Sequence, residues 1–176
     1  MNEVKVASLG LDKASNTPVV ILQEMDGERV LPIWIGPGEA SAIAMELAGM
    51  KFSRPLTHDL FYALLKGLGT ELQRVLITKV VDNTYHAELI LRRDGEVVSI
   101  DARPSDSIAI ALRAKAPIYA HDDLLEQAAI EIQSADMEPG EATETPVSEE
   151  PAEMDAEQLK DYLKRLNPED FGRFNP

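Results

Sequence analysis

The sequence predicts an α+β domain with a mostly antiparallel sheet, built from a duplicated β-β-β-α unit with extra helices. Two observations predict this class. Short apolar runs separated by turn residues recur in the order strand, strand, strand, helix. In addition, DGERVLPIWIGPGEASAIA and DGEVVSIDARPSDSIAIA align with a one-residue gap, which indicates an internal duplication. A chance likeness between two passages from a hairpin into a helix is the alternative.

The first unit is predicted to contain three strands and one helix. Alternating apolar residues from Val4 to Leu11 predict the first strand, and TPVVILQEM predicts the second. The Asp26-Gly27 pair is typical of a two-residue hairpin turn and leads into ERVLPIWI, the third strand. Pro37 then opens a helix. The predicted apolar face of that helix consists of Ala40, Ile43, Ala44 and Leu47.

The segment SRPLTHDLFYALLKGLG predicts a further helix between the two units. Thr57 or Asp59 could accept hydrogen bonds from the free amides at the start of this helix. Its predicted apolar face consists of Leu60, Leu64, Leu65 and Leu68.

The second unit follows the same order as the first. ELQRVLITKVV and TYHAELILRR predict two strands, and Asp94-Gly95 turns the chain into a third, EVVSIDA. A helix follows, with Ser105 as its predicted N-cap. PIYA and HDDLLEQAAI then predict a short strand and a last helix that complete the core. The side chains predicted to face inward from the Ser105 helix are Ile108, Ala111 and Leu112.

The amino-acid composition changes abruptly near Ser134, which predicts three segments. Residues 1–132 form the folded domain. Residues 133–154, rich in Glu, Pro, Thr and Ser, form an acidic disordered linker. Residues 155–176 form a helical tail with Asp155 as N-cap, and a frayed, solvated tail is the alternative. The apolar side chains at helical spacing in that tail are Leu159, Tyr162, Leu163 and Leu166.

Charge and composition exclude several classes of protein. The chain has no cysteine, which excludes disulfides and thiolate metal sites. Its net charge is −14: residues 1–132 hold 13 Lys and Arg against 19 Asp and Glu (−6), and residues 133–176 hold 4 against 12 (−8). This acidity argues against a generic nucleic-acid binder, because phosphate contacts need Lys and Arg. The N-terminus lacks a signal-peptide pattern and no stretch is apolar enough to span a membrane, so we expect a cytoplasmic protein without a membrane partner.

The candidate site residues gather at the predicted helix starts. In the stretch DARPSDS, Ser105 and Asp106 suit a helix N-terminus, whereas capping does not require Asp101 and Arg103. The Arg103 guanidinium could bind a phosphate beside the free helix amides. It could equally pair with Asp101 or Asp106 inside the fold.

A second helix start has the same pattern. Arg54 precedes a proline there, so it is a further candidate for binding a phosphate. His58, beside Asp59, could carry a proton near neutral pH, or it could be a surface histidine of the first helical turn.

Three carboxylates at the helix starts could hold a cation. Glu39, Asp101 and Asp106 offer hard oxygen ligands for Mg²⁺ or Mn²⁺, although no motif of fixed spacing supports such a site. Glu39 could also be a favourable first-turn acid and nothing more. The sequence holds neither a Walker motif nor a GxGxxG motif, so we expect no organic cofactor.

Three longer stretches carry a resemblance to a known family. LPIWIGPGEASAIAMEL, RPLTHDLFYALL and IDARPSDSIAIALRAKAPIYA resemble the bifunctional nuclease domain family, over residues 1–132. The ending LKRLNPEDFGRF looks like the tail of bacterial members. The resemblance implies an α+β domain, a homodimer, and nuclease activity on DNA and RNA.

Two hypotheses of function follow. The first is a metal-assisted phosphodiesterase in which Asp101, Arg103, Asp106 and His58 are catalytic, acting on weakly bound nucleic acid. In it, Arg54 and Arg103 position the phosphate, and Glu39, Asp101 and Asp106 hold the cation. The second is a non-catalytic dimeric module that binds an anion or another protein at the paired helix starts.

Overall fold

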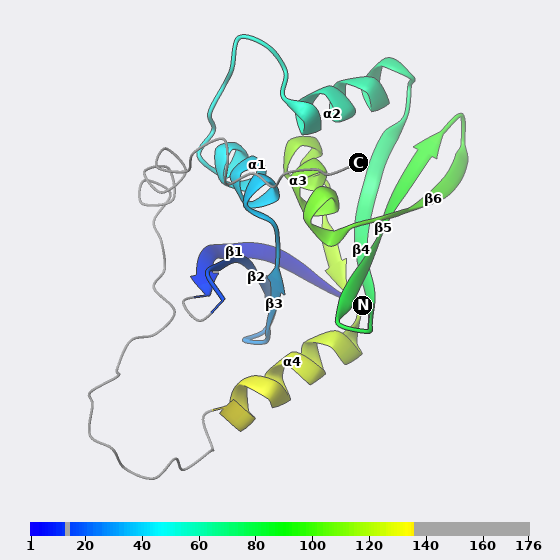
Figure 1. Cartoon of the computed structure of the whole chain (residues 1–176). Coiled ribbons are helices and arrows are strands. Elements are labelled where there is room, and N and C mark those ends of the chain that lie inside the picture. Colours follow the sequence, from blue (N-terminus) through cyan, green and yellow to red (C-terminus); the bar gives the residue numbers. More distant parts are fainter. Residues whose placement is uncertain (13–14, 136–176) are drawn as a thin grey trace.

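The computed structural model describes residues 1–12 and 15–135, and it contains one seven-stranded sheet and four helices (Figure 1). Helices α1, α2 and α3 lie together, and α4 lies apart from them. The strands are β1 (Asn2–Asp12), β2 (Thr17–Glu24), β3 (Val30–Trp34), β4 (Glu71–Val81), β5 (Thr84–Arg93), β6 (Glu96–Ala102) and β7 (Ile118–Ala120). The helices are α1 (Pro37–Leu47), α2 (Thr57–Gly67), α3 (Pro104–Ala114) and α4 (Asp122–Ala135).

The strand order is β3-β2-β1-β7-β4-β5-β6. Strands β1 to β3 form one antiparallel meander and β4 to β6 form another. The short strand β7 joins the two meanders, since it runs antiparallel to β1 and parallel to β4. The prediction of an α+β domain with a mostly antiparallel sheet is therefore confirmed.

The two halves share their order of elements. Each meander leads into an eleven-residue helix whose first residue is a proline, Pro37 in α1 and Pro104 in α3. A shared order of elements does not by itself show that one ancestral unit was duplicated, so the duplication stays a prediction. Superposing residues 3–48 on residues 72–114 is the measurement that tests it.

The core lies between the sheet and the helices that cover it. Helices α1 and α3 pack against each other, and α3 also packs against β4 and β5. Burying one large apolar side chain stabilises the fold by roughly 1.5–3 kcal/mol. The largest fully buried apolar side chains are Val20, Leu22, Leu31, Ile43, Val75, Ile77, Leu89, Ile108 and Leu125.

One predicted hairpin turn is confirmed and the other is wrong. Asp94 and Gly95 alone connect β5 to β6, both with positive φ (51° and 85°), as a tight two-residue hairpin requires. The connection from β2 to β3 is longer and spans residues 25–29. Arg29 closes this loop by donating two hydrogen bonds to Glu24, at 3.0 and 2.8 Å.

The predicted apolar face of α2 is mostly exposed. Only Leu65 is buried, while Leu60, Leu64 and Leu68 are exposed to solvent. The reason is that α2 lies at the margin of the helical layer, where it packs on α3 and only lightly on β4. The helix therefore has the predicted apolar face and presents most of it outward, as an apolar stripe.

Of the boundaries between the three predicted segments, only the first, between residues 132 and 133, lies among the described residues. Helix α4 continues to Ala135, so the first three residues of the predicted linker are helical. The remainder of the linker and the whole tail, residues 136–176, lie outside the described residues. Within residues 1–12 and 15–135, the structure has no helix both long and apolar enough to cross a membrane.

Candidate functional site

Three helices begin at one place in the structure. The guanidinium of Arg103, just before α3, lies 2.8 Å from Glu39 Oε1 in the first turn of α1. It also donates from Nε to Asp106 Oδ2, at 2.7 Å, in the first turn of α3. Asp106 Oδ1 lies 3.0 Å from Nε2 of His58, in the first turn of α2. We call these four residues, Glu39, His58, Arg103 and Asp106, the helix-start cluster.

The local sequence explains how Arg103 reaches this position. Pro104 disfavours the helical conformation for the residue before it, and Arg103 is extended, with φ −70° and ψ 143°. Arg103 is therefore the N-cap, and the helix begins at Pro104. Ser105, the predicted N-cap, is instead buried within the first turn. The hydroxyl of Ser107 donates to the Arg103 carbonyl at 2.9 Å and stabilises this first turn.

Asp106 is the central carboxylate of the cluster. Burial disfavours its charged form, but the hydrogen bonds from Arg103 and His58 outweigh burial, and the pKa of Asp106 lies below its usual value. An ionised carboxylate only accepts hydrogen bonds, so Nε2 of His58 carries the proton between them. The lone pair of His58 is then on Nδ1, which is the atom able to take up a further proton.

Arg103 combines two acidic partners with exposure to solvent. Its side chain is 65% exposed even though it contacts Glu39 and Asp106. The hydrogen bond with Asp106 outweighs burial and raises the pKa of Arg103, so the group stays charged. A guanidinium has five N–H donors, and the two contacts leave others for an incoming anion. With His58 neutral the cluster has one positive and two negative charges, and with His58 protonated its charges balance.

A second ion pair holds α2 against α3. Arg113, only 5% exposed, donates from Nε to Asp59 Oδ1 at 2.5 Å. The other oxygen of Asp59 accepts the backbone N–H of Leu56 at 2.9 Å, so the prediction that Asp59 satisfies a free amide is confirmed. Sequence reasoning missed Arg113. The available signal was its spacing of seven residues from Asp106, which places both on one face of α3.

The structure does not bring Asp101 into the cluster. In β6, Ile100 and Ala102 pair with the core residues Leu89 and Ala87 of β5, so Asp101 between them faces the other side of the sheet. There its side chain is 87% exposed and lies 3.9 Å from Nδ1 of His86.

Arg54 is also separate from the cluster. It lies in the exposed connection between α1 and α2 and makes no ion pair with any residue that the structure describes. Of the predicted site residues, Glu39, His58, Arg103 and Asp106 thus come together.

The predicted cation ligands do not form one centre. Asp101 lies on the opposite face of the sheet, and the guanidinium of Arg103 contacts both Glu39 and Asp106. Among residues 1–12 and 15–135, no three His, Asp or Glu side chains are placed to hold a metal ion together. The residues present therefore do not fit the predicted Mg²⁺ or Mn²⁺ site.

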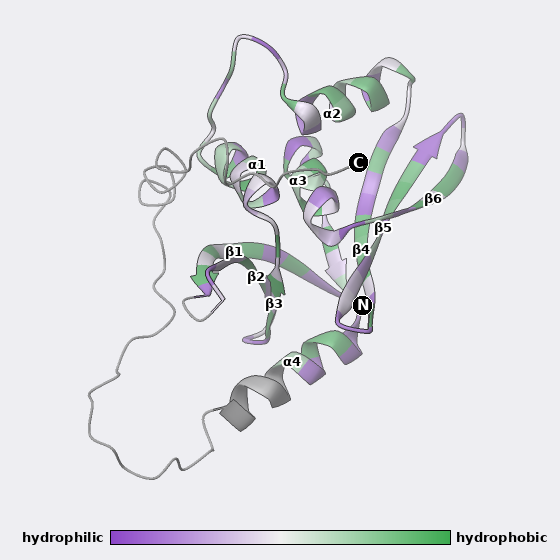
Figure 2. Cartoon of the chain, viewed as in Figure 1, coloured by the Kyte–Doolittle hydropathy of each residue, from purple (hydrophilic) through white to green (hydrophobic). Residues whose placement is uncertain are grey.

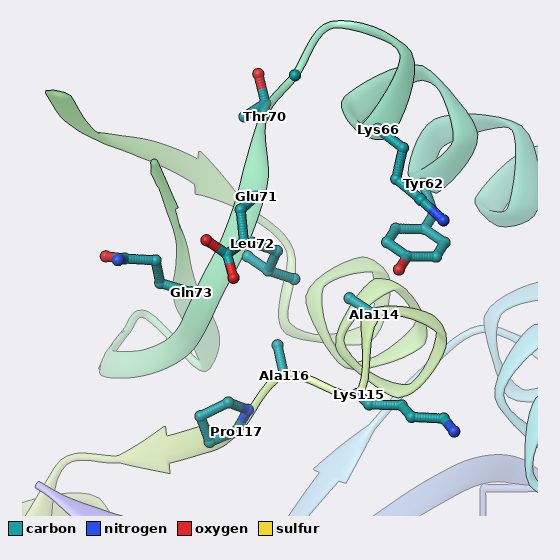
Figure 3. Close-up of a pocket in the computed structure, with 11 residues that line it drawn as sticks. Tyr62, Lys66, Thr70, Glu71, Leu72, Gln73, Ala114, Lys115, Ala116 and Pro117 are labelled. Carbon is teal, nitrogen blue, oxygen red and sulfur yellow. The ribbon is translucent and has the colours of Figure 1, made fainter. Parts of the chain in front are cut away.

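A cleft of about 510 Å³ lies at the opposite ends of α2 and α3 (Figure 3). Tyr62 and Lys66 enter it from α2, and the ammonium group of Lys66 lies 5.6 Å from the centre of the Tyr62 ring. Leu72 of β4 and Ala116, after α3, line it as well. No residue of the helix-start cluster lines this cleft, so it is a separate feature of the surface.

Comparison with known proteins identifies the family. An uncharacterized protein of Mycobacterium tuberculosis is 42% identical over 171 residues, which cover 97% of this chain and 98% of that protein. Bifunctional nuclease 2 of Oryza sativa subsp. japonica is 30% identical over 65% of this chain and 36% of its own length. Bifunctional nuclease 1 of Arabidopsis thaliana is 33% identical over 57% of this chain and 32% of its own length. The model of the bifunctional nuclease domain matches residues 20–133, and the chain therefore belongs to that family.

Proposed function

We propose that the protein hydrolyses phosphodiester bonds in DNA and RNA at the helix-start cluster. The observation that carries this proposal is the chain of contacts from Arg103 through Asp106 to His58, which joins an exposed guanidinium to an oriented imidazole. The family and the names of the plant relatives support the same chemistry.

Each residue has a separate role in this proposal. Asp106 holds the ring of His58 and fixes its proton on Nε2, so that Nδ1 can take a proton from a water molecule. The water oxygen bonds to phosphorus as the bond from phosphorus to the leaving sugar oxygen breaks, and His58 then returns the proton to that oxygen. Arg103 binds the phosphate and stabilises the charge that develops on its oxygens. Glu39 holds the guanidinium in place.

Binding of nucleic acid is expected to be weak. The chain carries a net charge of −14, and Arg103 has two acidic neighbours in the cluster.

A second candidate function is a non-catalytic dimeric module that binds an anion or another protein. The exposed apolar stripe of Leu60, Leu64 and Leu68 on α2 favours a protein partner, since soluble proteins seldom leave large apolar patches uncovered. This candidate predicts binding without cleavage.

The test is a cleavage assay on single-stranded DNA and RNA labelled at one end, using highly purified full-length protein. His58→Gln is expected to lower the rate about 100-fold or more, since a general base contributes at least that much. His121→Gln is the matched control, because His121 is partly exposed and is no member of the cluster. Equal rates for both variants would overturn the proposal. Parallel reactions with EDTA, with Mg²⁺ and with Mn²⁺ test whether a cation takes part.

A further inference from the structure

The connection between α1 and α2, residues 48–56, projects from the fold. Figure 1 shows it arching away from the two helices that it joins, and every residue in it is exposed. Backbone amides hold its two ends, at the last turn of α1 and at Asp59 of α2. Between those ends, residues 51–55 make no hydrogen bond or ion pair with any residue that the structure describes. The middle of the connection therefore presents its side chains to solvent.

The connection is positively charged within an acidic chain. It contains Lys51 and Arg54, and no acid occurs between Glu46 and Asp59. These two flanking acids both face Arg113, whose Nε lies 4.0 Å from Glu46 and donates to Asp59. Arg113 thus compensates the acids, while neither Lys51 nor Arg54 has an acidic partner among the described residues. Two uncompensated cations on an exposed segment favour a polyanionic ligand.

An exposed aromatic ring lies between the two cations. Phe52 directly follows Lys51, comes two residues before Arg54, and is 44% exposed. Figure 2 shows both hydrophobic and hydrophilic colours along the connection. Proteins that bind single strands combine cations, which contact phosphates, with aromatic rings on which unpaired bases stack. The order of cation, ring and cation therefore points to a single strand of nucleic acid rather than to a duplex, whose bases are already stacked on one another.

We propose that the connection binds a single strand of DNA or RNA beside the scissile phosphate, with a base stacked on Phe52 and phosphates at Lys51 and Arg54. This step rests on the proposed function, because it takes the helix-start cluster as the place of cleavage. Arg54 comes four residues before His58, and an extended chain spans at most about 3.6 Å per residue, so their Cα atoms lie within about 14 Å. Arg103 binds the scissile phosphate, and the connection binds neighbouring nucleotides of the same strand.

Fluorescence anisotropy with a labelled oligothymidylate tests the stacking, using the full-length protein at low salt. Phe52→Ala is expected to weaken binding at least about 5-fold, near the lower end of what one stacked base contributes, and Phe52→Trp should bind at least as well as the unmodified chain. The control is Trp34→Ala, since Trp34 is an exposed aromatic residue on the opposite edge strand, β3. Unchanged affinity of Phe52→Ala would overturn the proposal. An equal loss with a duplex of the same length would do so as well.

The salt dependence of binding tests the two cations. For single strands, log K falls with log salt concentration with a slope of about −0.7 for each phosphate contacted. Lys51→Ala and Arg54→Ala should each make the slope less negative by about 0.7, and Phe52→Ala should leave it unchanged. Lys79→Ala, which removes an exposed lysine of β4, is the matched control. Unchanged slopes for both variants of the connection would overturn the proposal.

Photo-crosslinking tests where the strand lies. An oligonucleotide that carries 5-iodouracil should crosslink to the ring on which that base stacks. Mass spectrometry of the digested complex should then find the crosslink at Phe52, and Phe52→Ala should abolish it. A crosslink confined to Trp34, or to Tyr62 in the separate cleft, would overturn the proposal.

These measurements follow binding and not cleavage, so their failure can be told apart from failure of the proposed function. A protein that needs His58 for cleavage but binds equally well without Phe52 would overturn the strand site alone. A protein that loses affinity as expected but cleaves neither DNA nor RNA would keep the connection as a single-strand site and overturn the proposed function. If no oligonucleotide binds even at low salt, the proposal is wrong and a protein is the remaining partner for the exposed ring.

Discussion

Arg113 Nε lies 2.5 Å from Asp59 Oδ1, and this pair joins the last turn of α3 to the first turn of α2. Nη1 of Arg113 also donates to the carbonyl of Ala109 at 2.8 Å, and both terminal nitrogens lie near the carbonyl of Ala42 in α1. One buried guanidinium thus holds three helices. Since His58 directly precedes Asp59, the pair also fixes where His58 meets Asp106.

Replacing Arg113 by Met should destabilise the fold by about 2–3 kcal/mol. Removing one partner of a fully buried ion pair costs roughly 3–5 kcal/mol, and Asp59 is partly exposed, so the expected loss is smaller. Urea denaturation measures the difference. The matched control is Arg92→Met, whose partner Glu71 is exposed, with an expected loss of about 0–1 kcal/mol. Equal losses for the two variants would contradict the role assigned to Arg113.

The acid sensitivity of the fold should depend on Asp59 and Asp106. The hydrogen bond from Arg113 lowers the pKa of Asp59 below the ordinary value of 3.8. The pKa of Asp106 is lowered as well, because its hydrogen bonds outweigh burial. A carboxyl whose folded-state pKa is depressed stabilises the fold above its unfolded value, and this stabilisation is lost as the pH falls through the lower folded value.

Measuring the free energy of unfolding as a function of pH checks that the fold loses this stabilisation as the pH falls. Asp59→Asn should be less stable than the unmodified chain at pH 7 and should lose less stability below about pH 4, since the variant has one titrating group fewer. Asp123→Asn is the control, because Asp123 lies at the exposed start of α4. Parallel curves for Asp59→Asn and the unmodified chain would show that the ion pair does not contribute.

Removing residues 136–176 should strengthen nucleic-acid binding at low salt. This segment holds 12 acidic and 4 basic residues, a net charge of −8, tethered to a domain that includes Arg54 and Arg103. A tethered acidic segment competes with phosphates for basic side chains. The difference should shrink as salt rises, because the screening length falls from about 30 Å at 0.01 M to about 8 Å at 0.15 M. Fluorescence anisotropy with a labelled oligonucleotide measures it, and identical affinities at low salt would exclude the competition.

The order of elements could be predicted from the sequence because each depends on local rules. The Asp94-Gly95 turn needs two residues with positive φ, and Pro37 and Pro104 mark helix starts. The position of β7 between the two meanders depends on pairing between distant segments. No local pattern in PIYA carries that information.

The candidate site was predicted only in part, for reasons of geometry. Glu39, His58, Arg103 and Asp106 all stand at helix starts, and those helix starts meet in space. Asp101 belongs to a strand, where one residue decides which face of the sheet a side chain reaches. The exposure of Leu60 on α2 could not be predicted from the sequence either. Helical spacing shows that an apolar face exists, but it does not show what covers that face.

The last prediction contrasts Arg103 with Asp101, two residues apart in the sequence and on different sides of the sheet. Arg103→Lys keeps the positive charge but cannot contact Glu39 and Asp106 with a planar fork while binding a phosphate. We expect the rate of cleavage to fall about 10- to 100-fold. This is near the lower end of the rate loss seen when a hydrogen-bond donor to the transition state is removed. The free energy of unfolding should change by less than about 1 kcal/mol, since lysine keeps the positive charge and the Arg103 side of both ion pairs is exposed to solvent.

Asp101→Asn should leave the cleavage rate unchanged, because its side chain is 87% exposed on the far face and contacts no member of the helix-start cluster. Initial rates on labelled single-stranded DNA and RNA, measured beside thermal unfolding, separate the two variants. A cleavage loss for Asp101→Asn equal to that for Arg103→Lys would mean that the reaction uses the other side of β6. An Arg103→Lys variant with full activity would leave the guanidinium with a purely structural role, as the link between the first turns of α1 and α3.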